Sequence, residues 1–355
     1  MTMHRPLGLG EQTYWLSDRW ATRHFALSAQ IAGRIDPRRI AAGLLAAQAR
    51  HPAFRVAIRQ NSRGEPVMVT DDSCPVPLRL VEYAGDDRSF NAAIAAELTQ
   101  PFDATNAPLL RCLLLASDNV SELILVINHA IGDGLSAATL ACEILGYPAG
   151  SQAKPARAPR PSLEDLVGIQ TPAIASTFPA QYPLRDPRNQ RWIAPAFLEP
   201  TELATLHRRC VTEGTTVHSA LCVAFTLAIL PETSFDAAAR CLCPINMRGH
   251  CAGLDADFGL FLSFAVSPYL YRQTSFWDQA RRLREHLVRA RNPALLSDRT
   301  AFFFATPPPP AFGTRRSLQY AASPRRQSAG RLEPRPHRLP LWRDGPAGKF
   351  DATLS

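Results

Sequence analysis

The stretch Leu-Ile-Leu-Val-Ile-Asn-His-Ala-Ile-Gly-Asp-Gly, from Leu123 to Gly134, decides the fold of this chain. Its first five residues have no polar face, which indicates a strand at the centre of a sheet. The glycines on either side of Asp133 predict a turn, and the apolar segment from about Leu135 to Leu145 predicts a helix after it. The sequence therefore places His129 at the end of a rigid strand, directly before a turn.

The segment has the pattern His-x-x-x-Asp-Gly, and its residue types suit acyl transfer. Imidazole titrates near neutral pH, so His129 is the candidate general base for a hydroxyl, amine or thiol that attacks a carbonyl. Gly134 lacks the Cβ that would crowd a substrate, and Asp133 can pair with a distant arginine and lock the turn. The pattern alone leaves a second interpretation open, which is a buried structural histidine at a strand end.

Helical and strand patterns alternate along the chain, which predicts an α/β (α+β) fold of two lobes. Asp36 and Pro37 open a helix, and a hairpin follows it with a turn at Asn61–Gly64. We assign residues 1–147 to the first lobe, 148–161 to a linker and 162–292 to the second lobe. Residues 293–355 are rich in Pro and Arg without either period, so we expect a disordered tail.

Four further segments carry a family resemblance together with the His129 motif. They are His-Pro-Ala-Phe-Arg at 51–55, Pro-Phe-Asp at 101–103 with Pro-Leu-Leu-Arg at 108–111, the helix from Thr216 to Ala228, and Pro-Ile-Asn-Met-Arg at 244–248. In order and spacing the chain resembles the superfamily of condensation domains and chloramphenicol-acetyltransferase-like acyltransferases, which includes alcohol acetyltransferases and the phthiocerol dimycocerosyl transferase. The resemblance covers roughly residues 7 to 291.

The resemblance implies two chloramphenicol-acetyltransferase-like lobes with a tunnel between them. An acyl thioester of CoA or of a carrier protein would enter from one side and a small-molecule acceptor from the other. His129 would deprotonate the acceptor, which attacks the thioester directly, and no metal or cofactor takes part. The remaining site residues implied are Asp133 as a structural residue paired with Arg248, Gly134 keeping the tunnel open, Asn128 in place of the first histidine of the family's pair, and Ser263 as an oxyanion donor.

The tail departs from the family, in which further strands follow the helix that corresponds to Phe276–Arg291. We therefore expect an incomplete second lobe. Two alternatives to a free-standing acyltransferase stay open. The first alternative is an inactive remnant, or a module that binds an acyl chain or carrier protein. The second is a stand-alone condensation domain that forms amide bonds.

The charge of the chain excludes a nucleic-acid partner. The formal net charge is +8, but residues 299–355 contain ten Lys and Arg against three Asp and Glu, so the remaining 298 residues carry only +1. Nucleic-acid binding needs a basic surface on the folded body. No apolar run reaches the ~18 residues that span a bilayer, and the N-terminus has no signal peptide pattern. We expect a cytoplasmic monomer.

Eight cysteines are spread along the chain without the Cys-x-x-Cys pairs typical of zinc sites. Several lie within apolar runs, where a thiol behaves as a small hydrophobic side chain. We therefore expect core thiols in a reducing compartment and no metal ligands. His218, near the start of an apolar helix, is expected to pack or cap rather than to form a site.

Overall fold

The computed structural model describes residues 2–18, 23–72, 75–147, 154–170, 198–230, 238–251, 254, 257–296 and 351–354. The chain divides into two compact units. The first comprises Met1–Pro195, Cys251–Phe261 and Pro340–Ser355, and the second comprises Ala196–His250 and Leu262–Leu339. Among the residues that the structure describes, no helix is long and apolar enough to cross a membrane.

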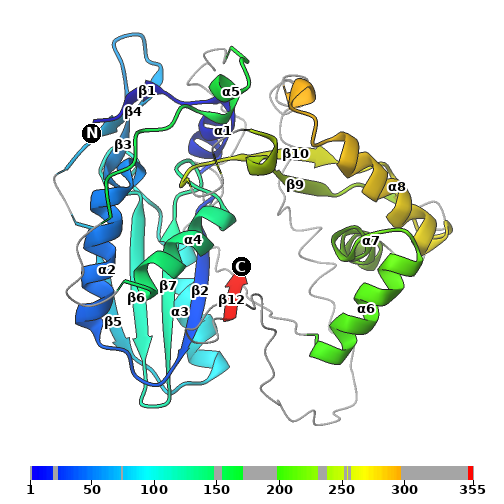
Figure 1. Cartoon of the computed structure of the whole chain (residues 1–355), viewed down its shortest axis with the longest axis horizontal. Helices are drawn as coiled ribbons and strands as arrows, with labels where there is room; N and C mark the ends of the chain where they lie inside the picture. The colour runs from blue at the N-terminus through cyan, green and yellow to red at the C-terminus, as the bar shows by residue number, and fades with distance from the viewer. Residues whose placement is uncertain are drawn as a thin grey trace. The chain divides into compact units, whose positions relative to one another are not determined.

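A five-stranded sheet forms the centre of the first unit (Figure 1). Its strands, in spatial order, are β12 (Asp351–Leu354), β2 (Phe25–Ala32), β7 (Val120–Ile127), β6 (Leu110–Ala116) and β5 (Leu78–Glu82). β5 and β6 are parallel and the other neighbours are antiparallel. Residues 123–127 are fully buried, which confirms the prediction that this strand is central.

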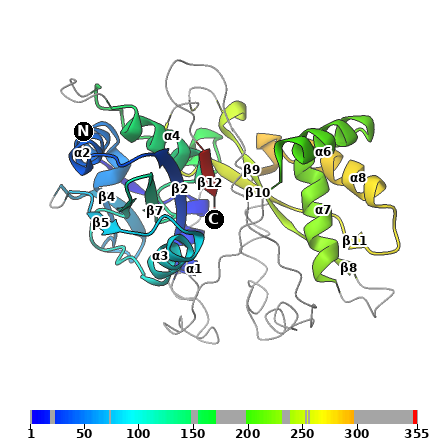
Figure 2. The same cartoon turned by 90° about the horizontal axis from the view of Figure 1, so that it is seen from below.

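Helices cover both faces of this sheet, as Figure 2 shows. The helices of the first unit are α1 (Leu9–Ser17), α2 (Pro37–Arg50), α3 (Asp87–Thr99), α4 (Gly134–Leu145) and α5 (Leu163–Leu166). Leu123 and Leu125 pack in one cluster with α2 and α4, whereas Ile124 and Val126 pack in another with α3, as the period of two in a strand requires. The predicted capping of α2 is confirmed, because the Asp36 side chain accepts a hydrogen bond from the Arg38 amide.

A smaller sheet in the same unit has the order β1 (His4–Pro6), β4 (Pro66–Thr70) and β3 (Val56–Gln60). The predicted hairpin is confirmed, and Gly64 adopts a positive φ of 78° in its turn. Phe54 lies directly before β3, in a 3-10 turn η1 (Pro52–Arg55). Its proline favours that turn at the end of α2.

The boundary between the units differs from the predicted one. Residues 154–170, divided in our prediction between a linker and the second lobe, lie in the first unit. Arg157 and Arg160 both form ion pairs with the buried carboxylate of Asp257, and the Gly10 amide donates to Glu164 at 2.8 Å. These contacts attach residues 154–170 to the first unit. The proline-rich composition of this segment predicts a linker because composition does not reveal such contacts.

The second unit contains helices α6 (Pro200–Thr212), α7 (Val217–Ile229) and α8 (Phe276–Arg289), with the turns η2 (Arg248–His250) and η3 (Pro293–Leu295). Its described strands form two antiparallel ladders, β9 (Leu242–Asn246) with β10 (Leu262–Val266), and β8 (Ala238–Ala239) with β11 (Leu270–Tyr271). The helix expected at Phe276–Arg291 is confirmed as α8, and it buries Ala280, Leu283 and Leu287 on one face.

The predicted disordered tail, residues 293–355, falls mostly outside the described residues. Its described parts contain η3 and the strand β12, whose backbone pairs with β2 so that Asp351 lies opposite Gln30. The tail therefore supplies one strand of the main sheet. Four residues are too few for a period-two pattern to be recognised within a Pro- and Arg-rich sequence.

Candidate functional site

Asn128 shapes the turn that connects β7 to α4. Its amide donates to the Leu109 carbonyl of the neighbouring chain segment at 3.0 Å, which continues the strand pairing by one residue. Its side-chain Oδ1 accepts from the Ala130 amide at 3.0 Å, and its carbonyl accepts from the Ile131 amide at 3.1 Å. These bonds close the backbone around His129 and fix the direction in which the imidazole leaves the strand.

Asp133 ties the same turn to two other segments. Its carboxylate caps α4 by accepting from the Ser136 amide at 2.9 Å, and its second oxygen accepts from the Phe261 amide at 3.0 Å. The residue is only 2% exposed, so both bonds are shielded from water. Arg248, the partner predicted for Asp133, lies in η2 of the second unit, and that pairing stays a prediction.

The imidazole of His129 lies between two aromatic rings. Tyr14 of α1 stacks on it, with ring centroids 4.0 Å apart and an interplanar angle of 16°. Phe25, the first residue of β2, contacts it at a centroid distance of 4.6 Å and a tilt of 49°. The Nδ1 atom is buried and has no hydrogen-bond partner among the described residues. The two aromatic rings therefore hold the imidazole by packing on its faces.

The surroundings of His129 favour the neutral imidazole. Burial lowers its pKa to about 4, because the charged form loses its hydration. The negative charge of Asp133 and the backbone groups of His129 and Gly132 raise the pKa and offset part of this effect, while Arg23 lowers it further. At neutral pH the ring is thus uncharged, which is the form that can accept a proton.

Tyr14 and Arg23 are neighbours of His129 that the sequence argument missed. Burial raises the pKa of the Tyr14 phenol, although the charge of Arg23 lowers it, and burial lowers the pKa of Arg23. Arg23 also donates its backbone amide to Asp18 at 2.6 Å. Because α1 and β2 are distant in sequence from the His129 motif, no local pattern connects these side chains to it.

The close approach that requires a glycine occurs at Gly132. A Cβ on this residue would lie 2.6 Å from the Phe258 ring, well inside van der Waals contact. Gly259, the residue after Phe258, is bonded to Ser136. The Ser136 hydroxyl donates to the Gly259 carbonyl at 2.8 Å and accepts from the Gly259 amide at 3.0 Å. Gly134, for which we predicted an open tunnel, is the first residue of α4, and its role stays a prediction.

Among the predicted site residues, the turn unites Asn128, His129, Asp133 and Gly134. Ser263 belongs instead to β10 of the second unit, where it is buried opposite Ile245, and its role as an oxyanion donor stays a prediction.

Two arginines of the family-like segments form ion pairs. Arg55 pairs with Asp72 at 2.9 Å and Arg111 with Glu97 at 2.7 Å. The first pair joins η1 to the segment after β4, and the second joins β6 to α3, so both stabilise the first unit.

Comparison with protein families matches residues 17–160 to the Condensation domain. Tyrocidine synthase 3 of Brevibacillus parabrevis is 33% identical over 123 residues, which are 34% of this chain and 2% of the synthase. Nonribosomal peptide synthetase kk1B of Curvularia clavata is 30% identical over 131 residues, which are 36% of this chain and 1% of the synthetase. The chain therefore spans only a few per cent of the length of these relatives.

Several solved structures, among them condensation domains, share the fold. The condensation domain from Monacolin K polyketide synthase MokA superposes with a TM-score of 0.60 at 16% identity, covering 86% of this chain and 80% of that one. The first condensation domain of the calcium-dependent antibiotic synthetase, in complex with a substrate analogue, gives 0.60 at 13%, covering 81% and 76%. Polyketide synthase associated protein 5 from Mycobacterium tuberculosis gives 0.59 at 17%, covering 86% and 78%. The fold class predicted from the sequence is confirmed.

Proposed function

We propose an acyl-transfer function for this chain, on the premise that its match to the Condensation domain over residues 17–160 reflects membership of that family. The substrates are an acyl thioester, carried by CoA or a carrier protein, and an acceptor with a free amine or hydroxyl. The products are an amide or ester and a free thiol. One relative is named a nonribosomal peptide synthetase, which favours a carrier-bound donor and an amine acceptor within this class.

The observation that carries the proposal is a neutral imidazole at the end of the central strand. His129 is held by the rings of Tyr14 and Phe25, and its lowered pKa keeps it unprotonated at neutral pH. In the proposed step, one ring nitrogen takes the proton from the acceptor as the acceptor's nitrogen or oxygen bonds to the thioester carbonyl. The carbon–sulfur bond then breaks, and the proton leaves with the thiol. Such general-base assistance contributes about 10²–10⁴-fold to the rate.

The function is tested by release of free thiol from a panel of acyl-CoA thioesters, with amines or alcohols as acceptors. We expect acceptor-dependent release that falls about 10²–10⁴-fold in His129→Ala. The matched control is His4→Ala, which removes an exposed imidazole from β1 and should leave the rate unchanged. Acceptor-dependent release that survives His129→Ala would overturn the role of His129.

The same assay separates the alternative function, a module that binds an acyl chain or carrier protein without turnover. A folded sample that releases no thiol, but binds an acyl-pantetheine probe, would support the binding module and contradict the transferase.

A further inference from the structure

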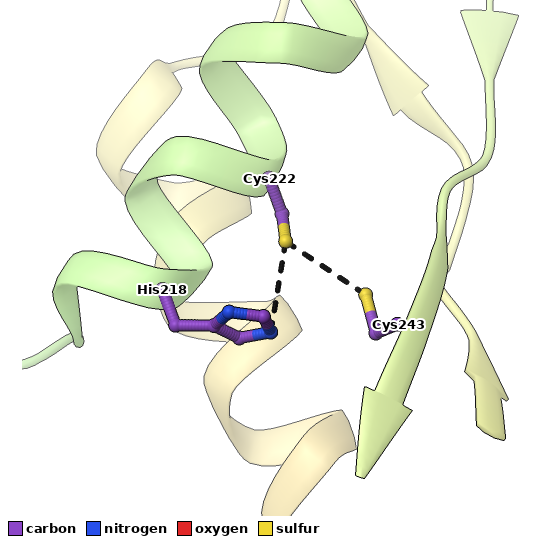
Figure 3. A group of neighbouring side chains, drawn as sticks. All are labelled: His218, Cys222 and Cys243. Atoms are coloured by element: carbon purple, nitrogen blue, oxygen red, sulfur yellow. Dashed lines mark hydrogen bonds between the residues drawn. The ribbon is translucent and has the colours of Figure 1, made fainter. Parts of the chain in front are cut away.

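Three potential metal ligands converge in the second unit, whereas the elements that hold His129 belong to the first. His218 and Cys222 are one helical turn apart on α7, and Cys243 lies on β9 (Figure 3). The Cys222 sulfur is 3.7 Å from His218 Nε2 and 3.9 Å from the Cys243 sulfur. All three ligand atoms lie within 4.8 Å of one another.

The two separations from the Cys222 sulfur match those of a tetrahedral zinc centre. With Zn–S bonds of about 2.3 Å and Zn–N bonds of about 2.0 Å, tetrahedral angles place two sulfurs about 3.8 Å apart and a sulfur and a nitrogen about 3.5 Å apart. The two measured separations, 3.9 and 3.7 Å, each differ from these values by about 0.2 Å or less. The side chains therefore need only small movements to enclose one ion.

Cys241 can supply the fourth ligand. Its sulfur is 3.5 Å from that of Cys243, and its backbone amide is held by the Ser267 hydroxyl at 2.9 Å.

We propose that His218, Cys222, Cys241 and Cys243 bind a single zinc ion. Three thiolates and an imidazole favour a soft cation over Mg²⁺ or Ca²⁺, and four protein ligands leave no open position, as in structural zinc sites. His218 is exposed, which gives the ion a route from solvent. The bound ion would join α7 to the two-stranded ladder β9–β10, and a ladder of that size has little stability of its own.

The test is a titration of the full chain, reduced and stripped of metal, with Co²⁺ followed by Zn²⁺. We expect one equivalent of Co²⁺ to give the intense visible bands of tetrahedral coordination and a near-ultraviolet thiolate-to-cobalt band, both removed by Zn²⁺. Zn²⁺ should also raise the melting temperature, whereas Mg²⁺ should not. Cys222→Ser should weaken Co²⁺ binding by more than about 100-fold, since even a residue that only supports a ligand contributes about 10–100-fold.

The His218→Ala variant removes one proposed ligand without unfolding the chain, because this side chain is exposed. It should keep the circular dichroism spectrum but change the cobalt bands. The matched control is Cys142→Ser, an exposed cysteine of the first unit, which should bind Co²⁺ as the unaltered chain does. A folded, reduced chain that gives no tetrahedral cobalt spectrum, or a Cys222→Ser variant that binds Co²⁺ as tightly as the unaltered chain, would overturn the proposal.

Discussion

Removal of the Asp133 carboxylate should destabilise the first unit more than removal of an ordinary helix cap. Asp133 caps α4 through Ser136 and also accepts from the buried amide of Phe261. Loss of a cap costs about 0.5–2 kcal/mol, and a buried amide left without a partner costs about 1–3 kcal/mol. We therefore expect Asp133→Ala to lower the free energy of unfolding by about 2–4 kcal/mol.

The matched control is Asp36→Ala, because Asp36 caps α2 through a single backbone bond to Arg38 at an exposed position. It should lower the free energy of unfolding by about 1 kcal/mol. Asp133→Asn should lie between the two, since one amide oxygen can accept from only one of the two sites well.

The assay is urea unfolding followed by circular dichroism, combined with hydrogen–deuterium exchange of the peptide that contains residues 257–261. Asp133→Ala should speed exchange at the Phe261 amide, while Asp36→Ala should leave it unchanged. Equal destabilisation by the two alanine variants, with no change in exchange at Phe261, would refute the reasoning that Asp133 joins the turn to this segment.

Three further changes probe the same turn. Gly132→Ala places a methyl 2.6 Å from the Phe258 ring, so it should cost about 1–3 kcal/mol in thermal unfolding, whereas Gly249→Ala, with open space around its Cβ, should cost less. Folding favours the neutral form of His129, so the unfolded chain binds more protons than the folded chain between pH 6.5 and about 4. The free energy of unfolding should therefore fall as the pH drops through this window, by about 3 kcal/mol in total. A His129→Gln variant that shows the same loss would contradict this. Tyr14→Phe keeps the ring that stacks on His129 and should retain thiol release, whereas Tyr14→Ala should reduce kcat about 10–100-fold. Equal rates for the two variants would exclude a role of the Tyr14 ring in positioning His129.

The sequence predicted the part of the site that is local in the chain. The apolar run before Asn128 indicates a buried strand, and the two glycines near Asp133 indicate a turn, so the placement of His129 follows from adjacent residues. The rings of Tyr14 and Phe25 could not be predicted in the same way. They reach His129 from α1 and β2 through strand pairing, which a local pattern does not encode.

The cysteines illustrate the same limit. A search for Cys-x-x-Cys pairs tests ligands within one segment, but Cys222 lies on a helix and Cys243 on a strand. The helical spacing of His218 and Cys222 and the alternation of Cys241 and Cys243 are each visible in the sequence. Only the packing of α7 against β9 makes them one cluster.

The pairing of β12 with β2 has a consequence for the synthesis of this protein. Strands β2, β5, β6 and β7 can assemble once residue 127 has left the ribosome, but Asp351 reaches its partner Gln30 only after more than two hundred further residues. During that time the outer edge of β2 has unpaired amides and carbonyls, which can recruit strands from other nascent chains. A ribosome-associated chaperone that shields extended edges should therefore increase the yield of soluble protein, and deletion of residues 351–354 should make that dependence permanent.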